Sequence, residues 1–264
     1  MSDTELMVRA AGLRTGRTPF VLATVVRAQR PTSAKPGDRA LVLPDGSMEG
    51  FVGGGCAEST VRTEGLRLLA AGESVLLRIT PEADSAAADD GVLTAAADDG
   101  VLTVGNPCLS GGALDIFLEA MLPPVLVHVY GDTPVGRALV EVGRALGYDA
   151  RLSESGVPLP PDLAAVVVAA HGHDEEPVLA SALRAEIPYI GLIASRRRGV
   201  AVLSNVDIPD RLRGNVHTPA GLDIGARGAG EIALSVYAEI VSGRPRREPV
   251  AALVGPAEHC CAHG

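Results

Sequence analysis

The chain has 264 residues, of which 47% are hydrophobic, and a formal net charge of −9. This length exceeds the usual size of one domain and supplies enough apolar surface for two cores, so we expect two domains. The negative charge argues against non-specific nucleic-acid binding, which needs a basic face to displace counterions from phosphates. The longest apolar run, Leu163 to Ala170, is far shorter than the ~20 residues that cross a bilayer. Neither a nucleic acid nor a membrane is therefore an expected partner.

The N-terminal segment, Met1 to Gly12, carries charged side chains through its only hydrophobic stretch. It lacks the basic head and apolar centre of a secretory signal, so we expect a cytoplasmic protein. In that reducing compartment cysteines are thiols, metal ligands or reactive groups rather than a disulfide framework. The four cysteines are Cys56, Cys108, Cys260 and Cys261.

The first half of the chain predicts a small α/β domain over residues 1–120. Alternating apolar residues indicate strands, and a helical stripe indicates one helix that ends at Gly72. The expected strands are 20–26, 39–43, 74–79 and 113–118, and the expected helix is 57–71.

Nine residues, Ala-Ala-Ala-Asp-Asp-Gly-Val-Leu-Thr, occur twice in tandem, at 86–94 and 95–103. Two copies of nine residues are too short and too few for a solenoid. We therefore predict a duplication that lengthens an exposed loop. Cation binding by its aspartates is the alternative, although nothing fixes a ligand geometry.

The second half begins with an apolar strand, 125–130, and a glycine turn that leads into a helix from Pro134. This order places backbone N–H groups and a helix dipole before an anion such as a dinucleotide pyrophosphate, with Gly131 and Gly136 as contacts. Glu154 lies where a ribose-binding acid belongs. Thr133 replaces the second glycine of the fingerprint, and its Cβ hinders close approach. Two interpretations stay open: a site for NAD(P) or another nucleotide, or a scaffold that binds another ligand or merely packs.

Strand and helix continue to alternate, which predicts a Rossmann-like, doubly wound parallel sheet over residues 125–243. Ligands of such sheets bind beyond the carboxyl ends of the strands. We predict ligand contacts there, because the guanidinium groups of arginine suit phosphate or carboxylate. The alternative is an ordinary solvated helix end. These contacts are His171, Ser195, Arg196 and Arg197.

Two histidine-containing groups have metal-ligand chemistry. His171 and His173 flank one glycine, so in an extended chain they point the same way and, with Asp174, form a possible metal site. Polar contacts to a ligand or to the sheet edge are the preferred interpretation. In the expected tail, 244–264, a soft-ligand cluster suits zinc or copper, and incidental affinity is the alternative. That cluster is His259, Cys260, Cys261 and His263.

The sharpest chemical feature is a cysteine that a glycine run delivers to the first turn of a helix. A helix N-terminus lowers the pKa of a thiol, a thiolate ligates soft metals or accepts sulfur, and glycine N–H groups cradle phosphate. Cys108 also lies beside glycines, and two small buried thiols beside tight turns are the alternative. The predicted contacts in this half are Gly53, Gly54, Gly55, Cys56, Glu58 and Cys108.

Four segments together resemble one family, the XdhC/CoxI accessory proteins that serve xanthine dehydrogenase, carbon monoxide dehydrogenase and related molybdenum hydroxylases. The segments are 53–58, 188–198, 221–226 and 231–233. The resemblance implies a maturation factor that binds the molybdopterin form of the molybdenum cofactor and protects it while a terminal oxygen is exchanged for sulfur. It also implies delivery to the hydroxylase apo-enzyme, a cysteine desulfurase as a second partner, and a homodimer.

The resemblance makes Cys56 the family cysteine that contacts the cofactor through molybdenum or sulfur, and Glu58 follows it in the family position. Cys108 matches less well, because Leu109 and Ser110 separate it from the next glycines. We therefore expect a cofactor chaperone more than a catalyst. The alternatives are an NAD(P)- or flavin-dependent oxidoreductase that uses the Rossmann-like domain, and a protein-interaction scaffold.

Overall fold

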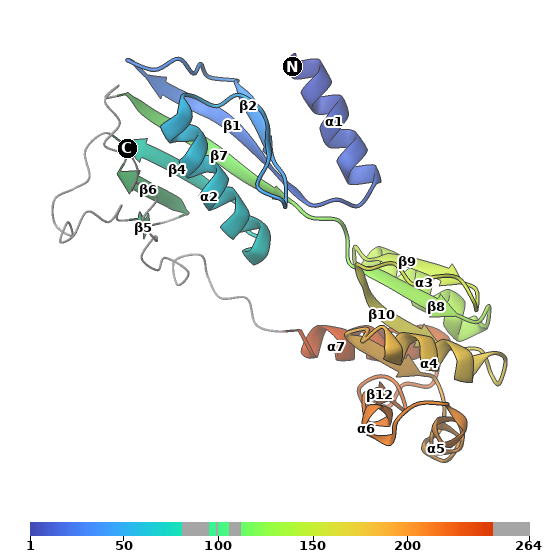
Figure 1. Ribbon diagram of the computed structural model, residues 1–264. Helices are drawn as coiled ribbons and strands as arrows, with labels where there is room; N and C mark the ends of the chain where they lie inside the picture. The colour runs from blue at the N-terminus through green and yellow to red at the C-terminus, as the bar shows by residue number, and fades with distance from the viewer. Residues whose placement is uncertain (81–94, 99, 106–111, 245–264) are drawn as a thin grey trace. The chain divides into compact units, whose positions relative to one another are not determined.

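The computed structural model describes residues 1–80, 95–98, 100–105 and 112–244. The chain divides into two compact units, one over Met1–Pro123 and one that begins at Pro124, and each is treated by itself (Figure 1). Cys108, the first copy of the tandem repeat and the cysteine and histidine residues of the expected tail lie outside the described residues.

The first unit contains a seven-stranded mixed sheet in the order β3-β2-β1-β7-β4-β6-β5. Neighbouring strands are antiparallel except for β4 and β6, which are parallel. The strands are β1 Phe20–Gln29, β2 Arg39–Val42, β3 Met48–Gly50, β4 Val75–Thr80, β5 Ala95–Asp98, β6 Val101–Gly105 and β7 Ala113–Met121.

Two helices pack on opposite faces of this sheet, because successive side chains of a strand point to opposite sides. Helix α2, Gly55–Ala71, covers the face that carries Val21 and Ala23, while α1, Asp3–Thr15, covers the face that carries Phe20. Helix α2 ends as predicted at Gly72, which has a φ of 68° and donates its N–H to the carbonyl of Leu68. The predicted small α/β domain is thus confirmed.

The second copy of the tandem repeat does not form the loop expected from the sequence. Its residues 95–98 form β5, which pairs antiparallel with β6, and Leu102 within it is buried in the core. The apolar Val-Leu-Thr end of the repeat therefore acts as a strand, because the sheet offers it a partner.

The second unit contains a five-stranded sheet in the order β12-β11-β10-β8-β9, and all its strands are parallel. The strands are β8 Leu126–Tyr130, β9 Asp149–Ser153, β10 Leu163–Val168, β11 Tyr189–Leu192 and β12 Val216–His217. The helices are α3 Pro134–Ala145, α4 Glu175–Arg184, α5 Arg196–Asn205, α6 Asp210–Arg213 and α7 Ala229–Ser242.

Helices cover both faces of the parallel sheet, which confirms the doubly wound architecture. Side chains of α3 and α7 pack in one cluster with Val127 and Val129, and those of α4 and α5 pack in another with Val166 and Val168. Strand β9 lies on one side of β8 and β10 lies on the other, so the order in which strands are added to the sheet reverses between β8 and β10. This reversal opens a crevice for ligands beyond the carboxyl ends of the strands.

Within the described part of the chain, no helix combines the length and the apolar character needed to span a bilayer.

Candidate functional site

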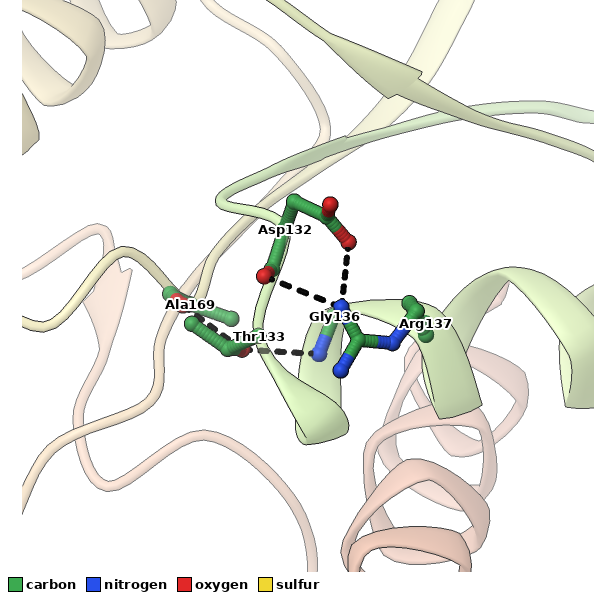
Figure 2. Close-up of polar contacts among 5 residues, drawn as sticks. All are labelled: Asp132, Thr133, Gly136, Arg137 and Ala169. Carbon is green, nitrogen blue, oxygen red and sulfur yellow. Dashed lines mark hydrogen bonds and ion pairs between the residues drawn. The ribbon is translucent and has the colours of Figure 1, made fainter.

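The glycine turn after β8 is tight and caps its own helix (Figure 2). The hydroxyl of Thr133 accepts a hydrogen bond from the N–H of Gly136 at 3.0 Å and donates one to the carbonyl of Ala169 at 3.0 Å. A Cβ on Gly136 would lie only 2.0 Å from the carbonyl oxygen of Gly131, so this position requires glycine. Thr133 therefore occupies one of the helix N–H groups that a pyrophosphate would use.

A cavity of about 560 Å³ opens beside this turn, at the carboxyl ends of β8, β9 and β10. We call it the acidic pocket, because carboxylates of Asp132, Glu154 and Asp174 line it, and none of its described lining residues is lysine or arginine. The guanidinium of Arg137 is held outward against Asp132 Oδ1 at 2.7 Å (Figure 2). Glu154 thus lines the pocket at the place where the sequence predicted a ribose-binding acid, and of the three carboxylates Asp132 is the one that Arg137 offsets.

A second cavity of about 580 Å³ lies at the ends of β10, β11 and β12. We call it the arginine pocket. It is lined by His171, Ser195, Arg196 and Arg198 on one side and by most of the loop 219–226 on the other. Asp223 is the carboxylate among its described lining residues.

Arg198 is fixed in this pocket by a buried acid. Its Nη2 lies 2.5 Å from Oε2 of Glu175, which is 1% exposed, and Oε1 of Glu175 accepts the N–H of Gly172 at 2.9 Å. One carboxylate therefore holds both the guanidinium and the turn that carries His171. Arg196, by contrast, is exposed and forms no ion pair with any described residue.

The structure separates the residues predicted at this edge. Ser195 caps α5 by accepting the N–H of Arg198, and Arg196 lines the arginine pocket as expected. Arg197 is exposed and lines neither pocket, and the pocket residue that the sequence missed is its neighbour Arg198.

The extended conformation expected for the two histidines is not found. His171 has a φ of 52° within a turn, so it lines the arginine pocket while His173 lines the acidic pocket. Among the residues that the structure describes, no three histidine, cysteine or acidic side chains are grouped to hold a metal.

One end of the loop 219–226 is attached to α7 through Glu239. Its carboxylate accepts hydrogen bonds from the Tyr189 hydroxyl at 2.6 Å and the Gly221 N–H at 2.8 Å, and lies 3.1 Å from Nδ1 of His217. Burial acts to raise the pKa of Glu239, but these hydrogen bonds outweigh it and lower the pKa. Burial and the bond to Glu239 raise the pKa of Tyr189. No sequence pattern indicated this group, since its members are separated by 18 to 50 residues.

The other end of the loop is held by Glu231, which accepts the N–H groups of Arg227 and Gly228 at 2.8 and 3.0 Å. These bonds lower the pKa of Glu231. Gly228 has no side chain to cap α7, and Glu231 in the first turn of the helix instead binds the chain that leads into it.

The predicted cysteine turn lies in the first unit. Gly54 precedes α2 as its N-cap, Gly55 begins the helix, and Cys56 follows as an exposed residue, unlike the buried thiol of the alternative interpretation. A Cβ on Gly54 or Gly55 would meet no atom within 4 Å, so packing inside this unit does not explain these glycines. Glu58, two residues after Cys56, is paired with Arg62 at 2.7 Å.

Comparisons with known proteins match both units. Residues 13–80 match the XdhC and CoxI family, and residues 127–240 match the XdhC Rossmann domain. The matched ranges include Cys56 in the first unit and the whole arginine pocket in the second.

Three curated relatives are similar at low identity. The uncharacterized protein YqeB of Escherichia coli K12 is 28% identical over 89% of this chain, and the chain spans only 46% of its length. The molybdenum cofactor insertion chaperone PaoD of the same organism is 25% identical over 86% of this chain and 84% of PaoD. A probable xanthine dehydrogenase subunit from Bacillus subtilis 168 is 37% identical over 33% of this chain and 25% of its own length.

A solved structure of a xanthine dehydrogenase from Bacillus halodurans aligns with 96% of this chain and 100% of its own, at 19% identity and a TM-score of 0.42.

Proposed function

The chain belongs to the XdhC/CoxI family, and we propose that it is a chaperone that holds the molybdenum cofactor and delivers it to a molybdenum hydroxylase. The observation that carries this function is the arginine pocket, a cavity of ligand size in the Rossmann unit that combines two guanidinium groups with apolar walls. Its distant relative PaoD, a molybdenum cofactor insertion chaperone, supports the same function.

The residues of the arginine pocket fit such a cargo. A volume of about 580 Å³ lies within the range of roughly 300 to 1,000 Å³ typical of small-molecule sites. Ile193, Leu222 and Ile224 provide apolar surface for a pterin ring, and the arginines provide donors for its phosphate. The cofactor brings its own metal chemistry, and the chain supplies binding and release.

Cys56 is the proposed soft ligand. An exposed thiol stands in the first turn of α2, and thiolates bind molybdenum or transferable sulfur. We propose Gly53, Gly54, Gly55 and Glu58 as its companions at this turn. The proposed partners are the hydroxylase apo-enzyme, a cysteine desulfurase that provides sulfur, and a second copy of this chain.

The rival function, a dinucleotide-dependent oxidoreductase, finds less support in the crevice between β8 and β10. The Thr133 hydroxyl takes the N–H of Gly136, and three carboxylates line the pocket where phosphates would lie. If NAD(P)⁺ or a flavin protected the protein against heat at micromolar concentration, the oxidoreductase function would be favoured over the chaperone function.

A reconstitution assay tests the chaperone function. A molybdenum hydroxylase apo-enzyme is mixed anaerobically with limiting cofactor, with or without this protein, and its activity is followed. We expect the protein to raise the yield of active enzyme, and Cys56→Ser to lose that gain. Ser59→Ala, an exposed change on the same helix, is the matched control and keeps it. An equal yield without the protein would overturn the proposed function.

A further inference from the structure

The two cavities at the carboxyl edge of the parallel sheet differ in charge. They have similar volumes, about 580 and 560 Å³, yet the arginine pocket presents two guanidinium groups and one carboxylate while the acidic pocket presents three carboxylates. The turn 171–174 contributes to both, with His171 in the arginine pocket and His173 and Asp174 in the acidic pocket. An anionic ligand at this edge is therefore directed to the arginine pocket.

The two arginines have different surroundings. The charge of Arg198 is offset by Glu175, which lies behind it and is 1% exposed. That bond uses one of the five N–H donors of a guanidinium, so Arg198 retains donors for the pocket in a fixed orientation. Arg196 has no ion-pair partner among the described residues, so its guanidinium is available to a ligand.

His171 completes this side of the pocket. His171 lies in a turn whose backbone is anchored, because the N–H of Gly172 donates to the same Glu175 that binds Arg198. Glu175 thus holds both the turn that carries His171 and the guanidinium of Arg198. A shared buried partner of this kind is expected of a binding site and not of unrelated surface charges.

From this arrangement we propose that the arginine pocket is a phosphate-monoester site, in which Arg196 makes the bidentate contact, Arg198 donates from the orientation that Glu175 fixes, and His171, which also lines the pocket, is a further donor. A phosphate monoester carries about −1.5 to −2 charges near pH 7 and has three acceptor oxygens, which matches these donors. The cofactor is then held in this unit by its phosphate end. The identity of that cargo rests on the proposed function, whereas the anion site rests on the two arginines alone.

The experiment uses the full chain and two simple probes, inorganic phosphate and phenyl phosphate, with binding measured by calorimetry. Arg196→Gln should weaken binding of both by about tenfold or more, the loss expected for a charge-assisted hydrogen bond. Arg197→Gln is the matched control, since Arg197 is adjacent, also exposed and outside both pockets, and its affinity should equal that of the wild type. Equal weakening in both variants, or no binding to the wild type, would overturn the phosphate site.

Retention of the molybdenum cofactor separates this inference from the proposed function. If phosphate binds through Arg196 but the cofactor is not retained, the anion site stands and the chaperone function fails. If the cofactor is retained equally by the wild type and by Arg196→Gln, the function stands and the phosphate site is wrong.

Discussion

The backbone N–H of Gly221 donates a hydrogen bond of 2.8 Å to the carboxylate of Glu239, and this bond ties a wall of the arginine pocket to α7. Gly221 has a φ of 100°, and a Cβ there would lie 2.3 Å from the hydroxyl oxygen of Ser235, so no other residue fits. The Tyr189 hydroxyl and His217 Nδ1 converge on the same carboxylate. The pocket wall is thus positioned by a residue that does not itself line the pocket.

Replacing Glu239 by alanine should loosen this wall. The Tyr189 hydroxyl and the Gly221 N–H would lose their acceptor, at a cost of about 1 to 3 kcal/mol in the free energy of unfolding. Hydrogen exchange of the amides of 219–224 should accelerate, while that of α4 stays unchanged. Urea unfolding and hydrogen-exchange mass spectrometry measure the two effects. Glu239→Gln keeps one acceptor oxygen and should lose less, so equal losses in the two variants would contradict this role.

The pH dependence of Glu239 follows from its lowered pKa. Because the folded protein holds this pKa below its ordinary value of 4.5, the ionised carboxylate favours folding. This contribution is fully present above pH 4.5 and is lost as the pH falls through the folded-state pKa. The stability difference between the wild type and Glu239→Gln should therefore shrink as the pH falls below 4.5. A difference that grew on acidification would refute the assignment.

The ion pair between Arg198 and Glu175 should respond asymmetrically to substitution. The Arg198 side chain is 34% exposed and the Glu175 side chain 1% exposed. Arg198→Met leaves a buried carboxylate without its counter-ion, which should lower the free energy of unfolding by about 3 kcal/mol. Glu175→Gln leaves a guanidinium that reaches water, so it should lower that free energy less. Urea unfolding of both single variants and the double variant measures the difference. The double variant should recover stability relative to Arg198→Met, and equal costs for the two single variants would contradict the asymmetry.

Thr133 should act as a helix cap, and removal of its side chain alone should not create a nucleotide site. Thr133→Ala should cost about 1 kcal/mol in unfolding free energy through loss of the cap on α3, and Thr133→Ser should cost much less. Thr133→Gly opens the turn but leaves the three carboxylates of the acidic pocket in place, so NAD(P)⁺ should still not raise its melting temperature. Dinucleotide protection of Thr133→Gly would show that the Thr133 side chain, and not the three carboxylates, excludes the ligand.

Much of the second unit was predictable because β8, β10 and β11 are mainly apolar runs, and because Pro134 begins α3 and Ser195 caps α5. Helix α1 was missed, although Ser2 and Glu5 form a capping box whose two members can be recognised in the sequence. Strand β12 has only two residues, Val216 and His217, too few for any periodic pattern. The second repeat copy looked like a loop, since its Ala-rich start has weak strand preference and its pairing with β6 is set by the sheet.

The candidate site was predicted only in part, for a physical reason. Arg196 and His171 follow strands directly, so their place at the carboxyl edge can be deduced from the order of elements. Arg198 and Glu239 act through Glu175 and Gly221, which lie 23 and 18 residues away in the chain, and only the folded chain brings these partners together. The sequence pattern identifies Thr133 as a replacement of the second fingerprint glycine. It does not indicate that the Thr133 hydroxyl caps α3.

Cofactor retention by the purified protein tests the central claim most directly. Wild type, Cys56→Ser and Ser59→Ala are mixed anaerobically with molybdenum cofactor and desalted, and retained molybdenum and oxidised-pterin fluorescence are quantified. Wild type and Ser59→Ala should retain both in equal amounts, and Cys56→Ser should retain clearly less while its circular dichroism is unchanged. Loss of molybdenum and pterin from all three folded proteins would contradict the account.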